Sequence, residues 1–289
     1  MQHGAPGGDG ELAAAWAYCA AQARTADHGR WLCGLFAPEA ARHDLWALLA
    51  FNAEVARTRE VVREPMLGQI RLQWWREAIA EAYAGRARAH QVMAPLADAI
   101  ARRRPPVERF ETLLDGRLRD LDDQPFATLA DLEAYAQATS GTLSLLMLDM
   151  LGVDDGGARE AATAIGTAWA LVGLVRATPH LAAHRRLMMP TDLMGDINPE
   201  SLFTGRPDAG LANVLRAVVD RASALLVEAR RHRRKVPTPA LPALVPARLL
   251  DRRIARIHRA DYLMFDQPQE TPSAADPIRL WWAVRTGRF

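Results

Sequence analysis

The sequence predicts an all-α protein, and three observations carry that prediction. Val, Ile, Thr and aromatic residues never alternate with polar residues for more than a few positions, so no β-strand is predicted. Apolar residues instead recur at helical spacing in several stretches. The Pro- and Gly-rich segments between these stretches are short, and no internal repeat is visible. The 289 residues, of which 49% are apolar, suffice for one helical domain with a core.

The first predicted helix covers residues 40–62, where one face carries Leu45, Leu48, Leu49, Asn52 and Val55. A second helix contains Ile70, Trp74 and Tyr83 and ends near Gly85. A third starts at the prolines 105–106, because proline suits the first turn of a helix, and continues to Leu118.

Four more helices follow. Asp131 is the predicted N-cap of the fourth, which reaches residue 152 with a break at 140–141. The fifth covers 160–175, which includes the longest uncharged run, 161–175; this run is too short for a membrane span and predicts a buried core helix. The last two cover residues 209–232 and 246–265.

The predicted domain organisation has three parts. Residues 1–10 form a flexible N-terminus, residues 11–266 a single helical domain, and residues 267–289 a C-terminal tail. Within this tail, 267–277 reads as loosely structured, and the apolar segment 280–289, with Trp281 and Trp282, is expected to pack on the core or remain a tail.

Composition limits the classes of function. A net charge of +2 and 24% charged residues exclude a disordered polyelectrolyte and give no basic field for nucleic acid. Cys19 and Cys33 form no metal-binding spacing, which favours buried thiols in a reducing compartment. The N-terminus has neither signal-peptide nor transit-peptide character, so a cytoplasmic location is expected. Lys235 is the one lysine, and the arginine excess is read mainly as coding bias.

Several stretches, in order along the chain, resemble the elements of one known protein family. DHGRWLCGLFAPEAARHDLWALLAF resembles the opening helices of the family, and RLQWWREAI resembles its RLxWWR element. LLDGRLRDL followed by AYAQATSG is similar to the DGMRMDL and YCxxVAG elements, and residues 165–190 match a long segment without a gap. The family that these stretches resemble is the squalene/phytoene synthase family of head-to-head prenyl transferases. The resemblance spans residues 27–257 and implies the isoprenoid-synthase fold, with helices around a central cavity.

The same comparison implies that the metal site is lost. Active members hold Mg²⁺ between two aspartate-rich motifs, since hard cations need carboxylate oxygens. At the first motif this chain has Ala56, Arg57, Arg59 and Glu60, and at the second it has Ala177, His180 and Leu181. Two cations about 4 Å apart repel by about 4 kcal/mol at an effective dielectric constant near 20. We therefore expect no catalytic residues, no metal and no cofactor.

A narrower resemblance concerns function. The sequences FNAE and VRATP are similar to the branch of the family that contains a mitochondrial assembly factor of respiratory complex I, which has also lost its aspartates. The resemblance implies a non-catalytic protein that supports complex I assembly, with complex I subunits or assembly intermediates as partners and an isoprenoid or lipid ligand in the cavity. The alternative is an active prenyl transferase that condenses prenyl diphosphates with Mg²⁺ as cofactor.

Candidate ligand-binding residues follow from charge and position. Guanidinium groups bind phosphate directly, which makes candidates of Arg57, Arg59, Arg176, Arg185 and Arg186. Glu54 and Tyr135 are candidates because of their positions in the family motifs. The competing interpretation is that Arg57 pairs with Glu54 or Glu60, and that Tyr135 is a core residue. His180 and His184 have metal-ligand spacing, but no third ligand is identifiable.

The basic run 230–235 marks one end of the sixth predicted helix. It complements the helix dipole, and it is the first candidate for peripheral contact with the inner face of the cytoplasmic membrane. A nucleic-acid partner is not expected.

Overall fold

The chain forms fifteen α-helices within residues 8–62, 64–267 and 272–289, which are the residues that the computed structural model describes, and no strand occurs among them. The helices are α1 (Gly8–Ala26), α2 (His28–Gly34), α3 (Glu39–Ala56), α4 (Thr58–Val61), α5 (Pro65–Tyr83), α6 (Met93–Arg103), α7 (Val107–Leu118), α8 (Leu129–Ala136), α9 (Thr142–Met150), α10 (Gly156–Ala183), α11 (Pro199–Phe203), α12 (Leu211–Arg230), α13 (Leu241–Leu244), α14 (Pro246–Arg259) and α15 (Asp276–Thr286). The predicted all-α class is confirmed.

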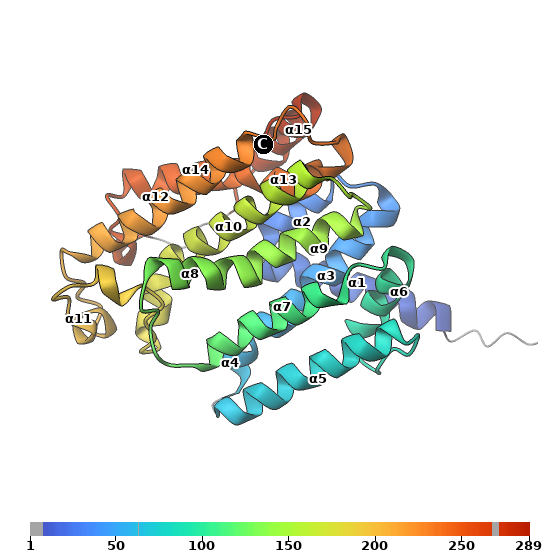
Figure 1. The fold of residues 1–289 in the computed structure, drawn as a ribbon, viewed down its shortest axis with the longest axis horizontal. Helices are drawn as coiled ribbons and strands as arrows, with labels where there is room; N and C mark the ends of the chain where they lie inside the picture. Colours follow the sequence, from blue (N-terminus) through green and yellow to red (C-terminus); the bar gives the residue numbers. More distant parts are fainter. Residues whose placement is uncertain (1–7, 63, 268–271) are drawn as a thin grey trace, which may run out of the picture.

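Figure 1 shows how the helices stack. α5, α7, the α8–α9 segment and α14 run in roughly the same direction, one above the other, with α1, α2 and α3 behind them. α10 lies inside this arrangement and packs against α12, α9 and α14. Its inner face is buried because small and apolar side chains such as Ala161, Ile165 and Val172 recur along it.

α10 is longer than predicted and continues through Pro179 to Ala183. It is the one helix in the described part of the chain that is long and apolar enough to cross a bilayer. However, 67% of its most apolar window is buried inside the protein, as the sequence predicted for residues 161–175. The helix is therefore the centre of the core.

The end of α3 differs from the prediction of one helix over 40–62. α3 ends at Ala56, Arg57 is the residue between two helices, and α4 is a separate short turn. The start of α8 also differs, because Thr128 and not Asp131 is the N-cap. Thr128 and Asp131 form a capping box in which each side chain accepts a hydrogen bond from the other residue's backbone N–H.

The predicted break at residues 140–141 is a π-helix, Gln137–Gly141, which joins α8 to α9. It packs closely on α10 because Gly166 has no side chain there. A Cβ atom on Gly166 would lie 2.4 Å from the Ser140 carbonyl oxygen and 2.5 Å from the Ser144 hydroxyl oxygen. The wider turn and the glycine together bring the α8–α9 segment against the central helix.

The two ends of the chain are more regular than predicted. α1 begins at Gly8, while residues 1–7 of the predicted flexible N-terminus lie outside the described residues. Much of the predicted tail forms α15, whose Leu280 and Ala283 are buried. Part of the predicted loose segment, 268–271, also lies outside the described residues. Cys19 and Cys33 are buried free thiols.

Candidate functional site

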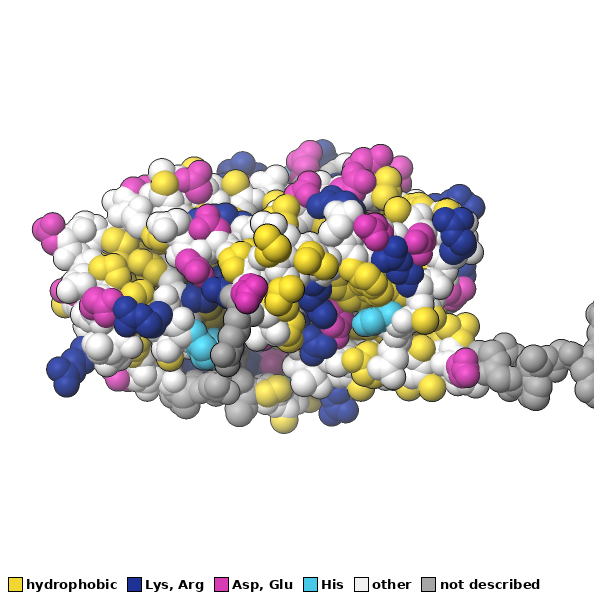
Figure 2. All heavy atoms as spheres, turned by 90° about the horizontal axis from the view of Figure 1, so that it is seen from below, with side chains coloured by type: hydrophobic (Ala, Val, Ile, Leu, Met, Phe, Trp, Pro, Cys, Tyr) yellow, Lys and Arg dark blue, Asp and Glu magenta, His cyan; other side chains and the backbone are white. Residues whose placement is uncertain are grey.

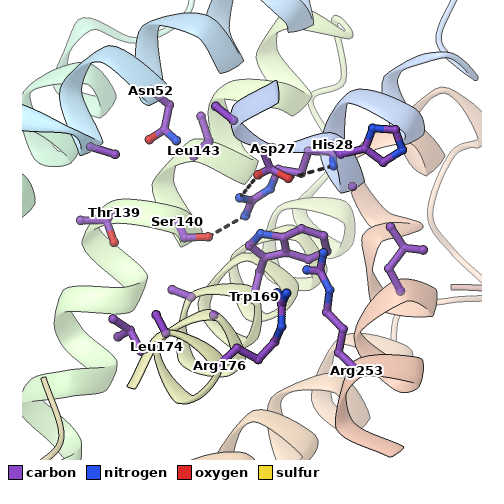
Figure 3. A pocket seen from close by; sticks show the side chains of 18 of the residues that line it. Asp27, His28, Asn52, Thr139, Ser140, Leu143, Trp169, Leu174, Arg176 and Arg253 are labelled. Carbon is purple, nitrogen blue, oxygen red and sulfur yellow. Dashed lines mark hydrogen bonds and ion pairs between the residues drawn. The ribbon is translucent and has the colours of Figure 1, made fainter. Parts of the chain in front are cut away.

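A cavity of about 660 Å³ lies between the central helix and the helices around it (Figure 3). α2 and Asp27, α3, the α8–α9 segment, α10 and α14 each contribute part of its lining. Figure 3 shows Trp169, Arg176 and Arg253 directed into the same space, with Asn52 and Thr139 on the other side. The structure thus has the central cavity that the sequence resemblance implied.

Only part of the first degraded motif lines this cavity. Ala56 lines the cavity, and so does Asn52, which lies one turn before the motif on α3. Arg57 and Arg59 are not among its lining residues. Where the family motif has an aspartate, the chain presents the methyl group of Ala56 to the cavity.

The arginines of this motif are held by acidic partners. Glu54 is buried, with a side chain 5% exposed, and it accepts hydrogen bonds from Arg57 and from Arg71, the latter at 2.7 Å. Arg59 donates to Asp123 at 2.8 Å. A buried carboxylate with two guanidinium partners is satisfied, so Glu54 and Arg57 form a structural ion pair of the kind that the sequence left open.

The second degraded motif lies on the cavity side of α10. Ala170, Gly173, Arg176 and Ala177 line the cavity. Leu181 packs against the core further along, and His180 borders a neighbouring hollow of about 450 Å³ that Arg176 also lines. Carboxylates are thus missing from both walls where the family would place them.

His180 and His184 do stack along α10, with ring centroids 4.5 Å apart. Among the described residues, however, no group of three or more His, Cys, Asp or Glu side chains is arranged to hold a metal ion. Among the described residues, the carboxylates that line the cavity are those of Asp27 and Asp276, and each is paired with an arginine. The donor set around the cavity therefore does not suit Mg²⁺.

The sequence did not single out the group of residues around Trp169. Arg30 is buried at 3% exposure and donates to Asp27 at 3.0 Å and to the Ser140 hydroxyl at 2.6 Å. The Arg30 and Arg253 guanidinium groups lie 4.9 and 4.1 Å from the centroid of the Trp169 ring. Burial lowers the pKa of Arg30, and the Asp27 charge opposes this shift. Only the i, i+3 spacing of Asp27 and Arg30 hinted at this network.

A second network lies on the opposite wall. Tyr135 donates to the buried Asp120 carboxylate at 2.6 Å, and Arg117 donates to the same carboxylate at 3.2 Å and to Asn52 at 3.4 Å. Burial, followed by the Asp120 charge, raises the pKa of Tyr135 above its usual value. Tyr135 therefore lines the cavity as a neutral phenol whose hydroxyl is held in place.

The other two predicted arginines lie away from the lining. Arg186 donates to the Asp120 carbonyl at 2.9 Å and so supports the second network from outside the cavity. Arg185 lies on the surface and pairs with Glu200 at 2.5 Å. Of the seven candidate ligand-binding residues, Tyr135 and Arg176 line the cavity, and the other five do not.

The cavity lining carries a net positive charge. Among the residues that the structure describes, the charged side chains that line it are five arginines, Arg30, Arg117, Arg176, Arg252 and Arg253, and two aspartates, Asp27 and Asp276. Five positive charges against two negative ones leave an excess of three among these lining residues, one of which is offset by Asp120, the partner of Arg117 just outside the lining. A partly enclosed cationic space with apolar walls suits a ligand that has an anionic head and an apolar body.

Comparisons with known proteins agree with this geometry. A family model for squalene/phytoene synthase matches residues 23–275, which is most of the chain. The chain belongs to the squalene/phytoene synthase family. Within this family it is similar to assembly factor 6 of NADH dehydrogenase (ubiquinone) complex I from Bos taurus, with 29% identity over 266 residues, which cover 91% of this chain and 80% of that protein.

Two solved structures show the same fold. A squalene synthase, HpnC from Alicyclobacillus acidocaldarius, superposes with a TM-score of 0.75 at 24% identity and covers 87% of this chain and 96% of its own. A dehydrosqualene synthase solved with a ligand gives a TM-score of 0.82 at 18% identity, covering 96% and 97%. The fold of this chain is therefore the isoprenoid-synthase fold, as the sequence resemblance implied.

Proposed function

We propose that this protein is a non-catalytic member of its family that supports the assembly of respiratory complex I. The observation that carries the proposal is the cavity itself, in which Ala56 and Ala177 stand where carboxylates would hold Mg²⁺. Similarity along 91% of the chain to a complex I assembly factor supports the biological role. The expected partners are complex I subunits or assembly intermediates, met in the cytoplasm at the inner face of the cytoplasmic membrane.

The cavity ligand that we propose is an isoprenoid or lipid with a phosphate-bearing head. Trp169, Leu143 and Leu174 offer apolar contact, while Arg176 and Arg253 offer charged hydrogen-bond donors. Guanidinium groups bind phosphate oxygens in pairs without a metal ion, so such a ligand can be held where Mg²⁺ cannot. Binding then needs no ionisation of the ligand and no catalysis.

The assembly role is tested by deleting the gene in the organism that carries it. We expect less mature complex I on native gels and slower NADH-dependent quinone reduction, both restored by the wild-type gene. Normal complex I in the deletion strain would contradict the role.

The cavity is tested in the same strain with two substitutions at one position. Gly173 faces the cavity, and a Cβ atom built there has no neighbour within 4 Å. Gly173→Phe should fill the cavity and fail to restore complex I, whereas the matched Gly173→Ala should restore it. Equal rescue by both variants would show that the cavity is not needed.

The alternative, an active prenyl transferase, has a direct test. Purified protein is incubated with farnesyl or geranylgeranyl diphosphate and Mg²⁺, and released diphosphate is measured against a sample without protein. We expect no release above that background, since the cavity lacks the carboxylates that would hold the metal. Release that depends on Mg²⁺ would overturn the non-catalytic assignment.

A further inference from the structure

α15 presents an unusual surface for a helix at the edge of a fold. Ile278, Trp281 and Trp282 are 70%, 53% and 58% exposed, while Leu280 and Ala283 between them are buried and hold the helix on the molecule. The three exposed side chains line one hollow of about 620 Å³ together with residues of α14. Large apolar side chains gathered on one surface usually mark an interaction site.

The exposed charges on α15 itself are positive, while Asp251 and Asp276, which line the same hollow, are each paired with arginines. Arg279, Arg285 and Arg288 are exposed on α15 or just after it. Asp276 is the acidic residue of this helix, and it is 6% exposed and paired with Arg252. Therefore α15 presents arginines and aromatic rings to solvent, with no exposed carboxylate side chain on the helix.

The basic run at the end of α12 extends the same surface. Arg230 and Arg233 donate through Nε to the carbonyl oxygens of Phe289 and Gly287, at 3.0 and 3.2 Å. These contacts place the neighbouring exposed Arg234 and Lys235 beside the end of α15. The face in Figure 2, by contrast, shows acidic and basic side chains interspersed.

We propose that the exposed side of α15, with the adjoining end of α12, binds the surface of an anionic lipid bilayer. Tryptophan rings lie at the boundary between lipid head groups and acyl chains, and arginines nearby pair with anionic head groups. This membrane-binding surface, defined by Ile278, Trp281, Trp282, Arg279 and Arg285, matches both chemistries. Lipid binding here does not depend on the proposed role in complex I assembly.

The membrane-binding surface also adjoins the cavity. Leu249, Arg252 and Asp276 line both the hollow on α15 and the central cavity. The N-terminal end of α15 therefore separates the two spaces, and the Arg252–Asp276 ion pair stands between them. A bilayer on this surface would bring lipids next to the wall of the cavity.

Vesicle sedimentation with the full-length protein tests the proposal. The vesicles contain phosphatidylcholine alone, or phosphatidylcholine with about 30 mol % phosphatidylglycerol as the anionic lipid. We expect the protein to sediment with the anionic vesicles only, and to be released at about 0.5 M NaCl, where charges are screened. Protein that stays in solution with both vesicles would overturn the proposal and leave the surface to a protein partner.

Matched variants locate the contact. Trp281→Ser with Trp282→Ser, and separately Ile278→Ser, should lower the vesicle partition coefficient, the tryptophan pair by about tenfold or more. Arg279→Glu with Arg285→Glu should remove the preference for anionic vesicles. The controls are Ile70→Ser, at a site 60% exposed on α5, and Arg206→Glu, after α11. Equal losses in the controls would place the contact elsewhere; far-ultraviolet circular dichroism confirms that each variant is folded.

Discussion

Asp120 is a buried charge whose partners come from two directions. Arg117 supplies the opposite charge, and Tyr135 supplies a hydrogen bond at 2.6 Å. Asp120→Ala would leave Arg117 charged without its main partner, so we expect a loss of about 3–5 kcal/mol in the free energy of unfolding. Tyr135→Phe removes two hydrogen bonds, the one donated to Asp120 and the one accepted from Arg117, and should cost about 1–3 kcal/mol. Urea denaturation followed by circular dichroism measures both.

The surface pair Arg185–Glu200 is the control for this prediction. Both side chains are more than half exposed, and such pairs contribute about 0–1 kcal/mol. Arg185→Ala should therefore change the free energy of unfolding little. A loss of unfolding free energy as large as that of Asp120→Ala would mean that the buried network contributes no more to stability than a surface ion pair.

His90 makes the stability of the protein sensitive to pH. It lies against Trp74 and Trp75, and its Nδ1 accepts a hydrogen bond from the Val92 N–H at 3.1 Å. Burial lowers its pKa below 6.5, with the nearby charges of Glu54 and Arg71 acting in opposite directions. The unfolded chain binds this proton first as pH falls, so the His90 contribution is complete above pH 6.5 and is lost below it.

The test of this pH effect is His90→Asn, because an asparagine oxygen can accept the same Val92 N–H and does not titrate. We expect the free energy of unfolding to decline less between pH 7 and pH 5 in the variant than in the wild type. Parallel pH profiles would exclude His90 as the cause.

The residues of the site were only partly predictable. Ala56, Arg176 and Tyr135 were found because family motifs mark their positions in a single chain. Arg30 and Trp169 were missed because their contacts join distant segments, as with the 110 residues between Arg30 and Ser140. Arg57 and Arg59 were weighed as phosphate ligands, and their partners Glu54 and Asp123 became clear only in the fold.

At the scale of elements, the contact between α10 and the π-helix depends on one glycine. Gly166→Ala would place a Cβ atom 2.4 Å from a backbone oxygen, and backbone cannot move aside easily. We expect a loss of about 3 kcal/mol or more in the free energy of unfolding. Gly173→Ala on the same helix meets no atom within 4 Å and should raise stability by about 0.5–1 kcal/mol through helix propensity. Thermal melts of both variants measure the change in stability. Equal losses of stability in the two variants would contradict the close approach of α10 and the π-helix at Gly166.

Helices were easier to predict than their ends. Apolar periodicity located α3, α5, α7, α12 and α14, since each buries one face. The predicted helix ended at residue 175, before Pro179, because proline usually ends a helix. In the structure Pro179 removes a single backbone hydrogen-bond donor, and α10 continues for four residues beyond it because the helix is packed against its neighbours. The sequence did not predict α6, because its apolar face is strong but short. It did not predict α15, because tryptophans that face solvent do not form the buried apolar face by which a helix is recognised.

At the scale of the whole molecule, the two thiols report on global unfolding. Burial raises the pKa of Cys19 to about 12 and also raises that of Cys33, so both are protonated at neutral pH. A disulfide reagent should therefore label neither thiol quickly in the native protein and both in denaturant. Rapid labelling of either under native conditions would show local opening of the first helices. The Cys19→Ser and Cys33→Ser variants would assign the site.

The fold as a whole was predictable because several motifs occur in the right order along one chain. The sequence alone could not predict the sign of the net charge on the cavity lining. Arg30, Arg117, Arg252 and Arg253 come from three separate stretches, and their convergence follows from how the helices pack. Loss of carboxylates was visible in the motifs, whereas the excess of positive charge needed the fold.

Lys235 follows the end of α12, is exposed, and is the one lysine in the sequence. Amine-directed reagents would therefore modify a single side chain. A fluorophore coupled there would stand beside α15, and one coupled to a cysteine introduced at Arg206 would stand near α11, at the other end of the molecule in Figure 1. Because nearly all basic residues are arginines, a fluorophore on Lys235 can be used to measure the orientation of this protein on a surface.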